Sequence, residues 1–180
     1  LGAFVIQTFL GRRLPRGGDW VSIAAIFFSF ILSLLVFFDA LSTYDPRFKE
    51  TFSWDWISIP SLTVNFGFLI DNVSILMLIV VTFISFLIHL YSVGYMKEDP
   101  RYFRYYAYLS LFSFSMLGLV VVDNLFTLYI FWELVGLSSY LLIGFWFERP
   151  AAAAAGKKAF IVNRIGDVGL FIGILLIFFQ

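Results

Sequence analysis

Five long apolar runs, separated by shorter polar segments, dominate the pattern of the chain. Each is close to the roughly 20 residues that cross the ~30 Å hydrocarbon core of a bilayer as a helix. No run alternates apolar and polar residues, so helices are favoured over the strands of a membrane barrel. The runs cover residues 21–38, 72–96, 105–122, 124–147 and 159–180; the fourth contains Glu133, and the fifth contains Arg164 and Asp167.

Both ends of the chain are also apolar. The opening ten residues, LGAFVIQTFL, are too short to span a bilayer, and we interpret them as the end of an earlier helix. The last run continues through FIGILLIFF to Gln180, so we expect the chain to be a fragment of a longer protein. The pattern predicts an all-α polytopic membrane protein with five full transmembrane helices plus the end of an earlier one.

The loops between the runs differ in charge. Nine basic residues fall in three alternate loops, GRRLPRGGD, MKEDPRYFR and FERPAAAAAGKK, whereas the opposite side has only Arg47 and Lys49. This asymmetry predicts that the three basic loops are cytoplasmic. The long loop 39–66 would then lie outside, where Trp54 and Trp56 suit an interfacial belt and FSWDWISI suits a strand or hairpin. We interpret AAAAAG as loop leading into a helix that starts near Pro150.

Composition supports a membrane protein and excludes several other classes. The chain is 61% hydrophobic and 21% aromatic, with only 13% charged residues, too apolar for a soluble domain of this size. Its formal net charge is zero, which argues against nucleic-acid binding. It has no Cys and one His, so no disulfide framework, thiolate site or multi-His metal cluster is expected.

Glu133 is the first candidate for chemistry, because it lies near the centre of an apolar span. Helical spacing places it on one face with a few small or polar residues, namely Tyr129, Gly136, Tyr140 and Gly144. A charge at that depth costs about 2.5–3.5 kcal/mol on insertion scales. Either Glu133 is a protonated structural residue that is hydrogen-bonded to a neighbouring Tyr or Ser, or it carries protons, which is the usual role of an intramembrane carboxylate.

The last span brings further charges to a similar depth. Lys157, Arg164 and Asp167 share one face, and Arg164 and Asp167 are spaced to pair with each other. Such a pair could be an ion pair that only stabilises helix packing, or it could take part in the function of the site. Glu133, Asp167 and Arg164 sum to −1 when ionised, so we expect a protonated carboxylate or a basic partner on a helix beyond this chain.

A polar stripe along the second run contains His89. Asp71, Ser74, Thr82, Ser85, His89 and Ser92 recur at helical spacing on one face. Interhelical hydrogen bonding explains most such stripes. A hydrated proton path that passes His89 near the cytoplasmic edge is the alternative.

Several of these segments carry a family resemblance. LIHLYSVGYM, DNLFTLYIFWELVGLSSYLLIGFW and KKAFIVNRIGDVG stand together in family order. Over residues 67–173 the chain resembles the antiporter-like L subunit of bacterial NADH:quinone oxidoreductase, respiratory complex I. The resemblance implies the opening helices of an inverted-repeat antiporter bundle, with 1–66 as N-terminal helices and outer loop, 67–122 as preceding helices, and 123–180 as the start of the proton-translocating core.

The resemblance also implies roles for particular residues. Glu133 matches the family's intramembrane glutamate, which pairs with a Lys on a later helix, and Arg164 with Asp167 matches a motif that tunes that site. No cofactor is expected on this chain; NADH, FMN, iron–sulfur clusters and quinone belong to other subunits. Partners would be the other membrane subunits, lipid and protons in the bacterial inner membrane. The large subunit of a multisubunit Na⁺/H⁺ antiporter and a purely structural scaffold remain the alternatives.

Overall fold

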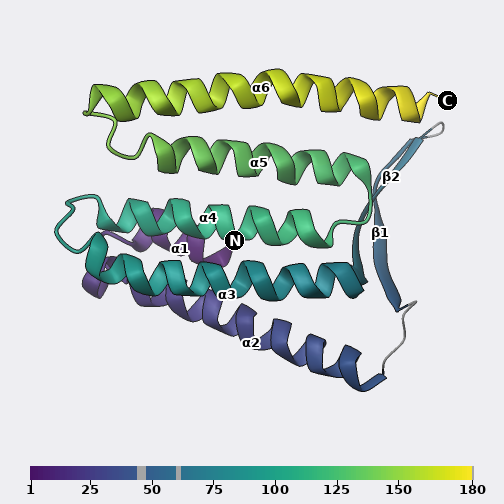
Figure 1. Cartoon of the computed structure of the whole chain (residues 1–180), viewed down its shortest axis with the longest axis horizontal. Coiled ribbons are helices and arrows are strands. Elements are labelled where there is room, and N and C mark those ends of the chain that lie inside the picture. Colours follow the sequence, from purple (N-terminus) through teal and green to yellow (C-terminus); the bar gives the residue numbers. More distant parts are fainter. Residues whose placement is uncertain (44–47, 60–61, 180) are drawn as a thin grey trace.

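The computed structural model describes residues 1–43, 48–59 and 62–179. Long helices lie side by side, and a two-stranded hairpin stands across one end of them (Figure 1). Arg47 and Gln180, which the sequence assigned to the outer loop and to the last span, lie outside the described residues. In chain order the elements are α1 (Gly2–Leu10), the 3-10 helix η1 (Pro15–Gly18), α2 (Asp19–Thr43), β1 (Lys49–Ile59), β2 (Leu62–Asp71), α3 (Asn72–Tyr95), α4 (Tyr102–Val121), α5 (Leu125–Ile143) and α6 (Pro150–Phe178).

The predicted spans are confirmed as helices. In the described part of the chain, α2 to α6 are each long and apolar enough to cross a membrane. Many large apolar side chains on them are exposed, including Phe28, Leu35, Ile165 and Phe178. Such exposure suits a surface that faces lipid or further helices rather than water. The all-α polytopic architecture therefore follows from the apolar pattern.

Two predicted boundaries were wrong. The AAAAAG segment is not loop: α6 begins at Pro150 and includes the whole alanine run. Alanine has the highest helix propensity, and proline is well tolerated in the first turn, so the helix starts at once. In addition, α5 ends at Ile143 rather than continuing to residue 147, and a short turn connects it to α6.

The predicted hairpin is confirmed. β1 and β2 pair antiparallel, with Phe52 opposite Phe68 and Trp54 opposite Phe66. The ring centroids of Trp54 and Phe66 lie 5.1 Å apart, in the range of favourable aromatic pairs. The Asn124 side-chain amide donates to the Asn65 carbonyl oxygen at 3.0 Å, which ties the hairpin to the turn between α4 and α5.

The basic segments gather at the end opposite the hairpin. The connections α3–α4 and α5–α6 both lie there (Figure 1). The residues that line one cavity, Arg12, Arg16 and Lys97 among them, place the α1–η1 segment at the same end. Not all of the nine predicted loop cations are in loops, since Arg104 belongs to α4 and Lys157 and Lys158 belong to α6. The predicted clustering of positive charge at one end nevertheless holds.

Glycines permit close contacts between α4, α5 and α6. A methyl group at Gly118 of α4 would overlap the ring of Phe131 on α5, so only glycine permits this approach. At the basic end of the same layer, a Cβ on Gly156 would lie 3.2 Å from the Gly144 backbone. These contacts place α5 between α4 and α6. The alignment of α5 with α6 positions the charged residues described next.

Asp71 caps the N-terminus of α3, and its substitution has a predictable effect. Its carboxylate accepts a hydrogen bond from the Ser74 backbone N–H at 2.8 Å, and this bond lowers the pKa of Asp71 below its usual value. Asp71→Ala should lower the free energy of unfolding by about 1 kcal/mol at neutral pH. Thermal unfolding of the purified full-length subunit measures this, and a variant as stable as the wild type would contradict the assignment.

The pH dependence follows from the direction of that shift. Because the folded-state pKa of Asp71 is lowered, its ionised form contributes stability above the ordinary pKa of the carboxyl group, and the contribution is lost as pH falls through the lowered value. Asp71→Asn keeps a capping oxygen that does not titrate. The difference in unfolding midpoint between wild type and Asp71→Asn should therefore shrink on acidification.

Candidate functional site

Glu133 and Arg164 lie at the middle of adjacent helices. Residue 134 is the centre of α5 and residue 164 is the centre of α6. At 1.5 Å rise per residue, Glu133 is about 1.5 Å from the centre of its helix along the axis. Asp167 is three residues past the centre of α6, about 4.5 Å along it. All three charged groups therefore lie near the middle of helices that are long and apolar enough to span a bilayer.

The structure brings these charges together. The Arg164 Nη1 contacts the Glu133 Oε2, and the Arg164 Nε lies 3.7 Å from the Asp167 Oδ2. Asp167 is almost fully buried, while Glu133 and Arg164 are partly exposed. The predicted Arg164–Asp167 pair is thus present, and the guanidinium also reaches across to α5. One cation is shared by two carboxylates.

Several polar atoms in this cluster lack hydrogen-bond partners in the described part of the chain. They are the Oε1 of Glu133, the Nε of Arg164 and the Oδ2 of Asp167, all buried. Buried charged groups without full hydrogen bonding are unfavourable. In the ionised form the cluster has one net negative charge, because Arg164 is one cation between two carboxylates.

Aromatic contacts hold the two helices in this register. Tyr129 packs on Phe171, with ring centroids 5.4 Å apart, and Tyr140 packs on Phe160 at 5.3 Å. The Arg164 guanidinium lies 4.9 Å from the centroid of the Phe160 ring, which offers it a cation–π contact. The small and polar face that the sequence predicted for α5 is therefore the face that meets α6.

Trp132 is a site residue that the sequence analysis missed. Its indole Nε1–H donates to the Asp167 Oδ1 at 2.9 Å. Together with Gly136, Asn163 and Asp167 it lines a cavity of about 410 Å³ between α5 and α6. Its position next to Glu133 was the available indication of a role in the site. Without a known hydrogen-bond partner, however, a Trp in an apolar span is interpreted as a lipid-facing aromatic residue.

His89 lies in a separate cavity that is lined by both hydroxyl and apolar side chains. This cavity has a volume of about 320 Å³ and shares no lining residue with the one beside Asp167. Ser22, Ser110 and Ser113 line it with His89. The predicted polar stripe of α3 does face protein, because Ser74, Thr82, Ser85, His89 and Ser92 are all buried. The structure does not place His89 beside Glu133.

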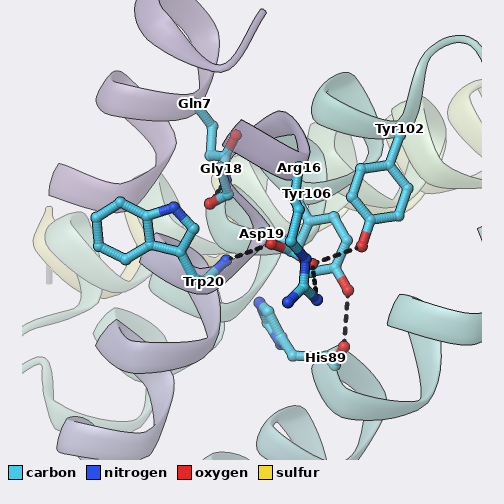
Figure 2. Close-up of polar contacts among 8 residues, drawn as sticks. All are labelled: Gln7, Arg16, Gly18, Asp19, Trp20, His89, Tyr102 and Tyr106. Atoms are coloured by element: carbon cyan, nitrogen blue, oxygen red, sulfur yellow. Dashed lines mark hydrogen bonds and ion pairs between the residues drawn. The ribbon is translucent and has the colours of Figure 1, made fainter. Parts of the chain in front are cut away.

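The environment of His89 indicates the tautomer of its neutral ring. Its Nδ1 lies 2.7 Å from the Ser85 carbonyl oxygen, and since a carbonyl only accepts, Nδ1 carries the hydrogen. The Tyr106 hydroxyl donates to the His89 carbonyl oxygen at 2.8 Å (Figure 2). In the neutral imidazole, Nε2 is then the nitrogen that can accept a proton.

Asp19 is a second residue that sequence reasoning missed. It is fully buried at the start of α2. Its carboxylate accepts from the Tyr102 hydroxyl at 2.8 Å and from the Arg16 Nη2 at 3.0 Å, and the Trp20 backbone N–H donates to it at 2.8 Å (Figure 2). Its place among arginines and glycines suggested an exposed loop. The available signal for a buried Asp19 was Tyr102, whose hydroxyl group can donate to a carboxylate and which lies in another segment of the same basic end.

Two family models match the chain. One, described as NADH-Ubiquinone oxidoreductase (complex I), chain 5 N-terminus, matches residues 56–106. The other, described as NADH:quinone oxidoreductase/Mrp antiporter, TM, matches residues 122–180. The second match contains Glu133, Arg164 and Asp167.

Similar proteins come from plastids, cyanobacteria and archaea. NAD(P)H-quinone oxidoreductase subunit 5 of the Chaetosphaeridium globosum chloroplast is 51% identical over 91% of this chain and 24% of its own length. Chain 5 of the Synechocystis enzyme is 57% identical over 67% of this chain and 18% of its own length. F420H2 dehydrogenase subunit L of Methanosarcina mazei is 46% identical over 97% of this chain and 25% of its own length. The chain thus spans a quarter or less of these relatives.

A solved structure shares the fold. A chain of the membrane-bound sulfane sulfur reductase, an archaeal respiratory membrane complex, aligns with a TM-score of 0.81 over 98% of this chain and 34% of that chain, at 19% identity. The resemblance drawn from the sequence motifs is confirmed. With motif, sequence and fold in agreement, this chain belongs to the complex I chain 5, or L-type, antiporter-like subunits and matches their N-terminal region.

Proposed function

We propose that the chain is part of a proton-translocating membrane subunit of NADH:quinone oxidoreductase, coupling quinone reduction elsewhere in the complex to proton transport through a site centred on Glu133. The observation that carries this proposal is the mid-span cluster of Glu133, Arg164 and Asp167. It has one cation for two carboxylates and buried oxygens without partners in the described chain. Intramembrane ionisable clusters of this kind mark proton relays.

The chemistry follows from competition for the guanidinium. When Arg164 is against Glu133, the ionised carboxylate is favoured, and when the guanidinium turns toward Asp167, burial favours protonated Glu133. Arg164 contacts both carboxylates, so a small displacement changes which of them it neutralises. Movement of a further cation near Asp167 would drive that displacement. Glu133 would then load a proton and release it in alternate states, with Asp167 and Arg164 tuning the site.

His89 would belong to a proton path that supplies this site. Its cavity is lined by hydroxyl groups that can order water, and its Nε2 can accept a proton. Because this cavity is separate from the one beside Asp167, a connection through α4 residues or through helices beyond this chain is required. The proposed role of His89 therefore concerns the access of protons to the charged site and not the charged site itself.

The wider assembly is part of the proposal. Relatives are named as subunits of quinone oxidoreductases, so we infer that this chain works with other membrane subunits. NADH, FMN, iron–sulfur clusters and quinone would be bound by other subunits. The basic end, with Arg12, Arg16 and Lys97, would face the cytoplasm of a bacterial inner membrane.

A second candidate is the large subunit of a multisubunit Na⁺/H⁺ antiporter, since the family description that matches residues 122–180 names both classes. Membrane vesicles that carry the full-length protein in its native complex discriminate between them. NADH-driven proton uptake, lost on deletion of the subunit, is expected under the first proposal. Proton movement driven only by a Na⁺ gradient would instead favour the antiporter.

Asp167→Asn should reduce NADH-driven proton pumping less than loss of Glu133 does. Asparagine keeps an acceptor for the Trp132 indole but removes the charge that competes for Arg164. The guanidinium should then stay with Glu133, favour its ionised form and slow proton loading without blocking it. Proton uptake per NADH oxidised measures the effect, and a variant with no change in that ratio would remove Asp167 from the mechanism.

A further inference from the structure

A basic cavity lies at the end of the helices opposite the hairpin. It has a volume of about 780 Å³ and is walled by the segment between α1 and η1, the last turns of α3 and the start of α4. Arg12 and Arg16 line it from the segment around η1, and Lys97 lines it from the turn after α3. It shares no lining residue with the cavities of Asp167 and His89, and the proposed proton transport does not use it.

The charge of this cavity is unbalanced. No acidic residue lines it. Arg12 and Lys97 make no ion pair with the described residues, and Arg16 pairs only with the buried Asp19 at 3.0 Å. Two positive charges therefore remain without a counterion in a half-enclosed space, and such an arrangement attracts an anion.

Apart from Tyr102, the remaining lining residues are apolar or small. Val93 and Phe103 line the cavity, together with the backbone of Gly11, Gly17 and Gly94. Gly17 has φ of 66°, and a Cβ there would lie 3.0 Å from the Tyr102 ring, so a larger residue would be strained and crowded. Cations beside an apolar wall fit an amphiphilic anion better than a small inorganic ion.

The position of the cavity fits the interface of a bilayer. It lies at the ends of membrane-spanning helices, among cations that cluster there. Tyr91 and Tyr95, in the last turns of α3, are 69% and 58% exposed, and their rings stack 5.6 Å apart. Exposed tyrosines of this kind gather at the level of lipid headgroups.

We propose that this cavity binds the phosphate headgroup of an anionic membrane phospholipid. Arg12 and Lys97 would contact the phosphate, and the first part of the acyl region would lie against Val93 and Phe103. Arg16 would stay tied to Asp19, which fixes the position of η1 at the cavity wall. Basic pockets between membrane helices bind lipid headgroups by this chemistry.

The test uses the intact complex with the full-length subunit. The delipidated complex is titrated in detergent with phosphatidylglycerol, with phosphatidylcholine of the same acyl chains, or with inorganic phosphate, and retained lipid is measured by mass spectrometry. The variant Arg12→Gln/Lys97→Gln should bind phosphatidylglycerol about fivefold more weakly for each cation removed. Phosphatidylcholine binding should change little.

Two further variants keep the result interpretable. Arg13 has the same charge one residue away and does not line the cavity, so Arg13→Gln should retain wild-type lipid binding. A Cβ on Gly94 meets no atom within 4 Å, so Gly94→Phe can fill the cavity without a change of charge and should also displace the lipid. Unchanged lipid binding by the double variant, equal loss in Arg13→Gln, or binding of inorganic phosphate in place of lipid would each overturn the proposal.

Discussion

Replacement of Glu133 by glutamine is expected to abolish the proton flux that passes through this chain while the complex still assembles. Glutamine has nearly the same shape and keeps an oxygen that can accept from Arg164. It has no titratable proton, so a carrier at this position can neither load nor release one. The expected loss is therefore the whole contribution of this site rather than a slower rate.

The measurement is proton uptake per NADH oxidised in vesicles that contain the intact complex. Glu148→Gln is the matched control, because Glu148 is an exposed carboxylate of the same chain at the basic end, paired with Arg101 at 2.6 Å. Glu148 is 58% exposed and lies outside the membrane-spanning helices, so its charge is not one of the mid-span charges. Glu148→Gln should leave the ratio of protons to NADH unchanged.

The Glu133 result also separates the competing functions. A well-assembled Glu133→Gln complex that pumps normally would exclude a proton-carrying role. If Glu133→Ala also preserved transport, the chain would act as a scaffold. Failure of Glu133→Gln to assemble would point to a structural role for the Glu133–Arg164 contact, the alternative that the sequence left open.

Replacement of Arg164 by glutamine should have the second largest effect, on assembly as well as on transport. Without the guanidinium, Glu133 and Asp167 face each other's helix with no cation from the described chain between them. An uncompensated charge at this depth costs about 2.5–3.5 kcal/mol on insertion scales. We expect a lower yield of assembled complex and loss of pumping in what remains.

Two companion variants test the reason for that loss. Arg164→Lys keeps the charge but not the forked guanidinium, so it should restore assembly better than transport. Combining Arg164→Gln with Glu133→Gln removes one charge of each sign and should recover much of the yield, as coupled sites do in a double-mutant cycle. If the double variant assembles no better than Arg164→Gln alone, the ionic explanation is wrong.

The apolar pattern was sufficient for most of the architecture. Membrane helices must be apolar along about 20 residues and must satisfy their own backbone, so composition and length alone predict them. The hairpin was predictable because FSWDWISI alternates. The start of α6 was not predictable, because an alanine run favours helix but also resembles a low-complexity loop. The contact of Gly156 with the Gly144 backbone distinguishes the two.

Part of the candidate site was also predictable from the sequence, and part was not. Helical spacing alone placed Glu133, Tyr129 and Tyr140 on one face, and Arg164 and Asp167 on another, because spacing along one helix is a local property. Trp132 and Asp19 were missed because their hydrogen bonds join residues 35 and 83 positions apart, respectively.

The sequence by itself therefore determined that this is a membrane protein, which segments are long and apolar enough to cross a bilayer, and that Glu133, Arg164 and Asp167 lie near the middle of two of them. Only the tertiary structure decided that Arg164 is shared between Glu133 and Asp167, that His89 lies in a different cavity, and that Arg12 and Lys97 meet at one pocket. The physical reason is that burial depth and helical faces depend on local spacing. Contacts between helices depend on how closely small residues such as Gly118 let those faces approach.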